Sequence, residues 1–175
     1  MTATIIILVI LAAIVAFIAS RPSEFRLERA ITIAAPPARV FPVINDFHNW
    51  NTWSPWEALD PSLQRTFTGA SAGAGSVYDW TGNKKVGAGR MTIQKSEPNA
   101  VVQILLEFIR PFKATNVTTF TLGSEGANAT RVTWAMTGTN NFMMKAMHLV
   151  MNMEKLVGGD FEKGLAAMKQ QVESR

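Results

Sequence analysis

The sequence predicts an α+β fold: a curved antiparallel β-sheet of six or seven strands wrapped on a long C-terminal helix, preceded by a separate apolar helix. Three observations lead to this prediction. The first twenty residues carry no charged side chain. Six short segments between residues 64 and 138 read as strands separated by turn residues. After residue 140, apolar residues recur at spacings of three and four, the period of one helical face.

The N-terminal segment has the length and composition of a membrane-spanning helix. Residues 5–19 are an unbroken apolar run. As a helix rising about 1.5 Å per residue, residues 2–20 extend roughly 28 Å, close to the thickness of a bilayer core. We therefore expect residues 1–22 to be a retained single-pass membrane anchor and residues 23–175 to form one ligand-binding domain.

A cleaved signal peptide and a buried core helix are the alternatives to an anchor. A cleaved signal peptide would have a basic start and small residues before the cut, whereas a cut after Ala19 puts Phe17 at the critical upstream position. A buried core helix is disfavoured because nothing polar interrupts the run. The cations Arg21, Arg26 and Arg29 all follow the span, so the positive-inside tendency places the domain in the cytoplasm.

Composition bounds the chemistry of the domain. The chain has 175 residues, no cysteine and a formal net charge of +4. Disulfides, thiolate metal sites and cysteine nucleophiles are therefore excluded. No run of Lys and Arg accompanies the positive charge, so we expect no nucleic-acid partner.

The domain begins with a strand and a short helix. Residues 25–33 place four apolar side chains on one parity, as a half-buried strand does. Pro36 and Pro37 then favour the start of a helix over residues 38–46, and Pro42 shortens or kinks it.

A tryptophan-rich stretch follows, WNTWSPWEALDP (50–61), whose three tryptophans are spaced three apart. Ser54 followed three residues later by Glu57 matches a capping box, with Pro55 at the first helical position. Pro61 stops the helix almost at once. We expect a second short helix here that closes one end of the sheet.

The predicted strands after this stretch form a meander. They cover residues 64–69, 76–80, 86–96, 101–109, 114–122 and 130–138. The pair Gly82-Asn83 is typical of a hairpin turn, and Gly87 and Gly89 indicate a bulge or a close approach to the backbone. Consecutive hairpins predict an antiparallel sheet.

The chain is predicted to end in one helix over residues 140–172, bent at Gly158-Gly159. Thr139 or Asn140 is a suitable N-cap. One helix cannot fill a wide concave sheet, so a cavity is expected between the two. Five methionines lie near the start of the helix, where they either fill the core or form an adaptable cavity wall; they are Met143, Met144, Met147, Met151 and Met153.

The sequence resembles the START-related SRPBCC superfamily, and within it the polyketide cyclase/dehydrase and lipid-transport-like branch. The resemblance rests on AAPPARVFPVINDFHNWNTWSPWE (34–57), GAGSVYDWTGNKKVGAGRMTI (73–93) and TRVTWAMTG (130–138). It covers about residues 23–172. It implies the helix-grip fold, with a hydrophobic cavity between sheet and C-terminal helix that binds lipids, sterols or polyketide-like molecules.

Candidate ligand contacts follow from strand parity and helix position. Phe108 and Phe120 lie on apolar strand faces, and Met147 lies one position from the main helical stripe. The tryptophans of the short helices are either structural pegs or part of the cavity mouth. The residues that we expect to contact a ligand are Trp53, Trp56, Trp80, Met91, Phe108, Phe120, Trp134, Met136 and Met147.

Recognisable catalytic patterns are missing from the sequence. The two histidines have no partners at metal-binding spacing, and no nucleophile elbow, phosphate loop or dinucleotide motif occurs. His48 beside Asp46 is expected to be solvated or to cap a helix. Asp79, Arg90 and Glu107 are expected to face solvent or form salt bridges. We therefore expect no catalytic residue, cofactor or metal.

Three functions remain open. The favoured one is a membrane-tethered carrier or sensor of a hydrophobic small molecule. The second is a polyketide cyclase/dehydrase-like enzyme using acid/base chemistry, which a buried ionisable residue in the cavity would favour. The third is a protein-binding module related to chaperone activators, which a large exposed apolar patch outside the cavity would favour.

Overall fold

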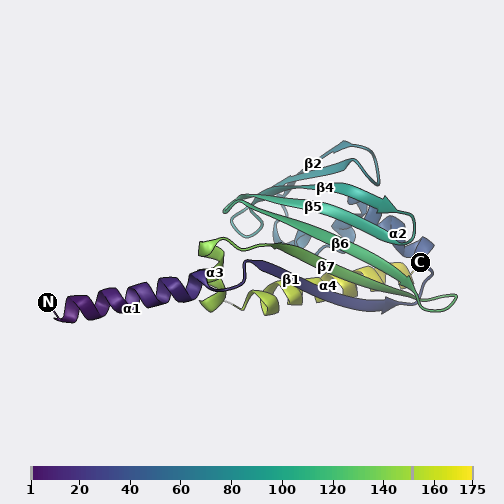
Figure 1. Ribbon diagram of the computed structural model, residues 1–175. Helices are drawn as coiled ribbons and strands as arrows, with labels where there is room; N and C mark the ends of the chain where they lie inside the picture. The colour runs from purple at the N-terminus through teal and green to yellow at the C-terminus, as the bar shows by residue number, and fades with distance from the viewer. Residues whose placement is uncertain (1, 151, 175) are drawn as a thin grey trace.

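The computed structural model describes residues 2–150 and 152–174, except for the side chains of residues 148, 150 and 153. Met151 and the side chain of Met153, two of the five methionines noted above, lie outside the described residues, as does the side chain of Val150. The described chain folds as a curved antiparallel sheet with helices across one face and a lone N-terminal helix projecting from one end (Figure 1). The predicted fold class is confirmed.

The sheet is an open meander of six strands, and the first strand of the domain is added at one edge beside the last. Its order is β1-β7-β6-β5-β4-β3-β2, and every neighbouring pair is antiparallel. The strand bounds agree with the sequence pattern to within two residues at nearly every end. The strands are β1 (Glu24–Ile33), β2 (Gln64–Gly69), β3 (Ser76–Thr81), β4 (Ala88–Glu97), β5 (Val101–Arg110), β6 (Ala114–Ser124) and β7 (Thr130–Thr139).

Three short helices follow β1: α2 (Pro37–Asn45), and the 3₁₀ helices η1 (Phe47–Thr52) and η2 (Glu57–Leu59). Asp46 caps η1, because its carboxylate accepts the backbone N–H of His48 at 2.9 Å. The indole N–H groups of Trp50 and Trp53 donate to backbone carbonyls of α2 at 3.0 and 3.1 Å. These two tryptophans therefore hold η1 against α2.

The predicted capping box at Ser54 is wrong. The N-cap position of η2 is Trp56, which makes no side-chain cap hydrogen bond. Glu57 accepts hydrogen bonds from Arg65 and Tyr78 instead of reaching back to the backbone of Ser54. Charged and phenolic donors from the sheet outcompete a local amide.

The single C-terminal helix predicted over residues 140–172 is two helices, α3 (Phe142–Val150) and α4 (Met153–Glu173). Asn152 caps α4 by accepting the backbone N–H of Lys155 at 2.9 Å. The helix α4 is continuous through Gly158-Gly159, the position at which a bend was predicted.

A close contact explains the first of these glycines. A Cβ atom at Gly158 would collide with the guanidinium group of Arg29 on β1. Arg29 uses that space to pair with Glu162 of α4 at 2.7 Å. Gly158 thus lets α4 approach the sheet.

An aromatic cluster joins helices and sheet in the core. The rings of Trp134 on β7 and Phe161 on α4 stack with centroids 4.0 Å apart. Trp53 packs edge-on against Trp134 at 5.5 Å and Phe120 at 6.0 Å. Each aromatic pair of this kind contributes about 0.5–1.5 kcal/mol beyond the area it buries.

The helix α1 (Thr2–Ala19) projects from the domain (Figure 1). It is long and apolar enough to cross a membrane, and of its residues only Ile18 is buried. Its end lies beside α3, where the Lys145 ammonium group donates to the carbonyl of Ala19 at 3.2 Å.

Candidate functional site

A cavity of about 1000 Å³ lies between the sheet and the helices. Its wall combines inward-facing side chains of β1 and β3 to β7 with residues of η1, η2, α3 and α4. Strand alternation explains the wall, because every second residue of a strand faces the same side of the sheet. The volume and the largely apolar lining are typical of sites for small molecules.

Most residues predicted to contact a ligand line this cavity. They are Trp56, Trp80, Met91, Phe108, Trp134, Met136 and Met147. Met147 comes from α3, Trp56 is the N-cap of η2, and the others come from the sheet.

Trp53 and Phe120 lie behind the wall. Both are buried in the core, and Trp53 uses its indole N–H to bond the carbonyl of Val43. The ring of Phe120 is covered by Trp50, Trp53 and Trp134, whose centroids lie 5.9, 6.0 and 4.8 Å away. These rings fill the space between Phe120 and the cavity, so we leave Trp53 and Phe120 out of the proposed contacts.

The ring of Trp80 lies close against Gly89 of β4. A Cβ at Gly89 would collide with the Trp80 ring and with the carbonyl of Glu107. The pairing of β4 with β5 shifts register at Ala88/Gly89, as in a bulge. The close approach predicted at Gly89 is therefore confirmed. The indole N–H of Trp80 also donates a hydrogen bond to the carbonyl of Val86 at 3.0 Å.

A polar cluster of Glu57, Tyr78 and Arg65 lies at the inner wall, with Arg65 partly exposed to solvent. The Tyr78 hydroxyl donates to Glu57 Oε1 at 2.6 Å, and Arg65 Nε donates to Glu57 Oε2 at 2.6 Å. The Glu57 side chain is 8% exposed and Tyr78 is 3% exposed. Glu57 and Tyr78 line the cavity, whereas Arg65 supports Glu57 from behind.

This environment alters two ionisation equilibria. Burial raises the pKa of the Tyr78 hydroxyl above its ordinary value, and the hydrogen bond to Glu57 raises it further. The hydrogen bond to Glu57 also raises the pKa of Arg65. Tyr78 is therefore a neutral hydroxyl at physiological pH, and Arg65 is a cation.

Sequence reasoning did not assign Glu57 and Tyr78 to the site. Glu57 fits a local capping pattern, and its actual partners, Arg65 and Tyr78, are distant in the sequence. Tyr78 carried a usable signal, because it shares a strand face with Trp80, a residue that was expected to contact a ligand.

Two cavity-lining residues carry buried polar atoms without a protein partner among the described residues. They are the indole nitrogen of Trp134 and the side-chain oxygen of Asn140. A buried polar atom without a hydrogen bond costs about 1–3 kcal/mol, so each of these atoms is a local energetic cost in the cavity wall.

The remaining candidate groups lie outside the cavity. Arg90 and Asp79 form an ion pair at 2.7 Å, and His48 bonds Asp46 at 2.8 Å. No cluster of metal-ligating side chains occurs in the part of the chain that the structure describes.

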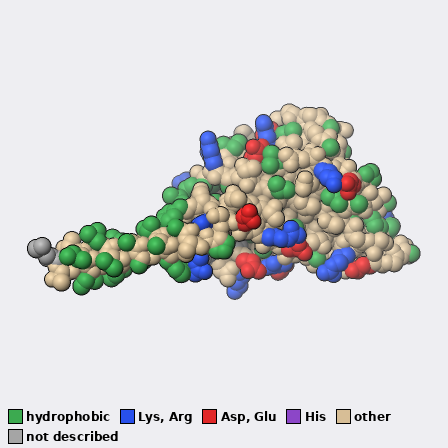
Figure 2. Space-filling model, viewed as in Figure 1, with side chains coloured by type: hydrophobic (Ala, Val, Ile, Leu, Met, Phe, Trp, Pro, Cys, Tyr) green, Lys and Arg blue, Asp and Glu red, His purple; other side chains and the backbone are tan. Residues whose placement is uncertain are grey.

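Part of the cavity lining is exposed, on α3 and on the turn between β5 and β6, and α1 ends against α3. Of the lining residues, Phe112 between β5 and β6 and Leu149 on α3 are exposed by 58% and 47%. Phe142 and Met143 on α3 add exposed apolar surface next to them. Figure 2 shows hydrophobic side chains covering α1 and continuing onto the adjoining end of the domain.

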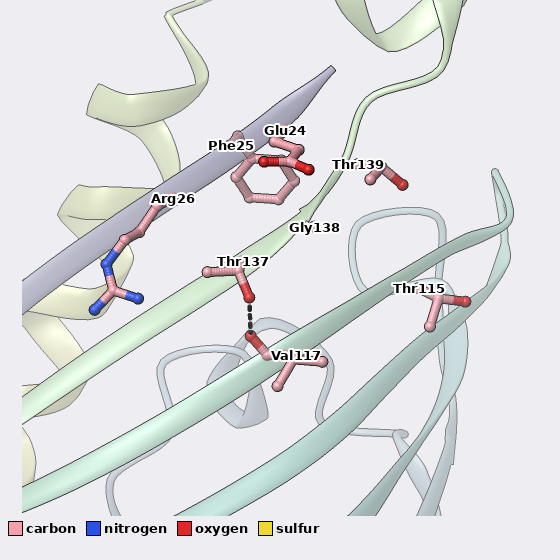
Figure 3. Close-up of a pocket in the computed structure, with 8 residues that line it drawn as sticks. All are labelled: Glu24, Phe25, Arg26, Thr115, Val117, Thr137, Gly138 and Thr139. Atoms are coloured by element: carbon pink, nitrogen blue, oxygen red, sulfur yellow. Dashed lines mark hydrogen bonds between the residues drawn. The ribbon is translucent and has the colours of Figure 1, made fainter. Parts of the chain in front are cut away.

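A second depression, of about 600 Å³, lies over β1, β6 and β7 (Figure 3). Its wall includes three threonines, Thr115, Thr137 and Thr139, with Glu24 and Arg26 at one side (Figure 3). Thr137 donates a long hydrogen bond of 3.5 Å to the carbonyl of Val117 there. It has little apolar surface for a ligand, so the larger cavity is the better candidate site.

Comparisons with known proteins agree with this architecture. The family model described as "Polyketide cyclase / dehydrase and lipid transport" matches residues 24–173. No curated protein matches the sequence.

Solved structures share the fold at low identity. The Zhui aromatase/cyclase from Streptomyces sp. R1128 has a TM-score of 0.64 and 15% identity, covering 87% of this chain and 95% of its own. The Aha1 dimer from Colwellia psychrerythraea has a TM-score of 0.61 and 14% identity, covering 85% and 96%. A protein from Thermobifida fusca has a TM-score of 0.63 and 18% identity, covering 84% and 92%. At these identities the likeness shows the fold alone.

Proposed function

The chain belongs to the polyketide cyclase/dehydrase and lipid transport family of the SRPBCC superfamily, and from this premise we propose that it is a membrane-tethered carrier or sensor. Its ligand is a hydrophobic small molecule, such as a lipid, sterol or polyketide-like compound, held between the sheet and the C-terminal helices. The observation that carries the proposal is the cavity of about 1000 Å³ with its largely apolar wall.

Apolar burial supplies the affinity. Removing apolar surface from water is worth about 25 cal/mol per Å², so a ligand burying roughly 300 Å² gains on the order of 7 kcal/mol before the costs of association. No reactive group is needed for this, and the aromatic wall presents Trp80, Phe108 and Trp134 as large, rigid surfaces.

The position of α1 supports a role for this helix in tethering the domain to the membrane. We propose that residues 1–22 anchor the chain in the membrane and that residues 23–175 form the ligand-binding domain in the cytoplasm. Because α1 ends against α3, and α3 lines the cavity, the mouth would lie near the bilayer surface. A ligand dissolved in the membrane could then enter without crossing bulk water.

A cyclase/dehydrase-like enzyme is the second candidate. The observation that favours it is the nearly buried carboxylate of Glu57 on the cavity wall. Both of its oxygens already accept hydrogen bonds from protein groups, Tyr78 and Arg65, so the carboxylate has a structural role in joining the sheet to η2. The carrier or sensor role therefore fits the site better.

A protein-binding role has less support. The exposed apolar residues Phe112, Phe142, Met143 and Leu149 could form such a surface. Phe112 and Leu149 line the cavity, whereas Phe142 and Met143 are exposed on α3 and do not line it. The residues on α3 lie on the helix against which α1 ends, where a membrane would cover them.

Native mass spectrometry of the full-length protein released from membranes tests the proposal. We expect a bound apolar molecule that organic extraction removes and that can be identified afterwards. A protein that carries no ligand and binds none of a broad panel of apolar probes would contradict the proposal.

A further inference from the structure

Tyr78 and Glu57, the polar pair on the inner wall of the cavity, can accept hydrogen bonds from a ligand but cannot donate them. Tyr78 has one hydroxyl hydrogen, and it is given to Glu57. The Glu57 carboxylate has no hydrogen to give while it is ionised. The two groups therefore present only acceptor positions toward the cavity: the free lone pairs of the Tyr78 oxygen and those of the Glu57 carboxylate.

The cluster is also neutral as a whole. Arg65 faces Glu57 at 2.6 Å, so one cation balances one anion. A ligand cation is not needed for charge balance, and it would have to leave water for an apolar cavity at a high cost. A ligand carboxylate or phosphate at this position would face the Glu57 carboxylate and receive no hydrogen bond from it. The Tyr78–Glu57 position thus disfavours charged headgroups of either sign, whereas the charged residues Arg26, Lys85 and Glu154 line other parts of the cavity.

Resting on the proposed function, we infer that the ligand is a neutral alcohol or phenol whose hydroxyl group donates its hydrogen to the Tyr78–Glu57 pair. The hydroxyl occupies the inner wall, and the apolar body extends toward the mouth at Phe112 and Leu149, where the surroundings are apolar and lie next to α1. A ligand of the same shape without the hydroxyl hydrogen leaves the acceptors unpaired.

The test compares 1-tetradecanol with its methyl ether, which keeps the oxygen but has no hydrogen to donate. Both compete with Nile red, a neutral apolar dye, for the full-length protein in lipid nanodiscs. The quantity of interest is the ratio of the two affinities. Partition into the lipid is the same for every protein variant, so a change in the ratio between variants reports the cavity alone.

Glu57→Gln reverses the polarity of the wall with little change in shape. The amide oxygen of the variant accepts from Arg65, and its NH₂ group then faces the Tyr78 oxygen. The Tyr78 hydroxyl is freed to donate to a ligand, which the ether oxygen can accept. Tyr78→Phe provides a second variant, because it removes the hydroxyl oxygen and leaves the ring.

In the parent protein we expect the alcohol to displace Nile red at lower concentration than the more apolar ether. In Glu57→Gln the preference for the alcohol should fall by about tenfold, the scale of a hydrogen bond to a charged group. Tyr78→Phe should lower it as well. Nile red binding by each variant reports that its cavity is folded.

The outcomes separate the inference from the proposed function. Preference for the ether in the parent, or a ratio that stays within about twofold in the variants, overturns the inference while leaving the cavity as a ligand site. Failure of the parent to bind Nile red or either competitor overturns the proposed function, and the inference with it.

Discussion

Tyr78, the only tyrosine of the chain, donates its hydroxyl hydrogen to Glu57 across 2.6 Å and so joins β3 to η2. The bond links the sheet to the short helices that close the cavity. Because Arg65 bonds the same carboxylate, strand β2 is tied to the same point. Ligand selection and local stability therefore depend on one cluster.

The first prediction concerns ionisation of Tyr78. Its pKa is raised on folding, so the stability that this group contributes is complete below its ordinary pKa of 10.0 and is lost as pH rises toward the folded value. Ultraviolet absorbance of tyrosinate reports this residue alone. We expect its titration midpoint to lie above 10.0 in the folded protein and near 10.0 in denaturant. Equal midpoints would show that the hydroxyl is not buried against Glu57.

The second prediction uses adjacent glycines of α4. Gly159 has no neighbour within 4 Å of an added Cβ, so Gly159→Ala should raise the free energy of unfolding by about 0.5–1 kcal/mol. Gly158→Ala gains the same helix propensity but displaces Arg29 from its pairing with Glu162. Urea denaturation should rank Gly159→Ala as the more stable variant. The reverse order would contradict the contact between Arg29 and Gly158.

The third prediction separates the tryptophans. Trp53→Ala removes a buried ring and the bond to Val43, so it should cost about 3–5 kcal/mol of stability. Trp56 is half-buried on the cavity wall, so Trp56→Ala should cost roughly 1–2 kcal/mol and weaken Nile red binding. Denaturation and dye titration of both variants provide the comparison. Similar stability losses would mean that both rings are core pegs.

Strand positions could be predicted because each strand alternates apolar and polar residues between turn residues. Parity could show which face of β6 looks inward, but not that Trp50, Trp53 and Trp134 cover Phe120. Whether an inward-facing side chain reaches the cavity depends on which other side chains cover it, and those side chains come from segments distant in the sequence.

The polar cluster was missed for a related reason. Glu57 fits a local capping pattern, yet its partners lie 8 and 21 residues further along the chain. The helix break was obscured because the apolar spacing continues through residue 152, where Asn152 caps a new helix. A local sequence pattern cannot show that a residue will instead bond a partner that is distant in the sequence and close only in the fold.

The fourth prediction concerns the N-terminal helix. The protein in membrane fractions should retain residues 2–20, because the segment is uncharged and has a poor cleavage site. N-terminal sequencing of that protein provides the test. A mature chain that begins near Ser20 or Arg21 would show a cleaved signal peptide, and the tethered carrier would have to be abandoned.

The fifth prediction tests the ligand cavity by filling it. Met147 lines the cavity from α3, whereas Met143 on the same helix is 58% exposed and does not line it. Met147→Trp adds ring volume within the site, and Met143→Trp adds the same volume on the surface. Both variants should melt close to the parent.

Titration of these two variants with Nile red and fluorescent sterols is the most direct measurement of whether this cavity is the binding site. We expect Met147→Trp to weaken binding by about tenfold or more, the equivalent of about 1.4 kcal/mol, while Met143→Trp binds as the parent does. A folded Met147→Trp protein that binds these probes with the affinity of the parent would contradict the assignment of the cavity.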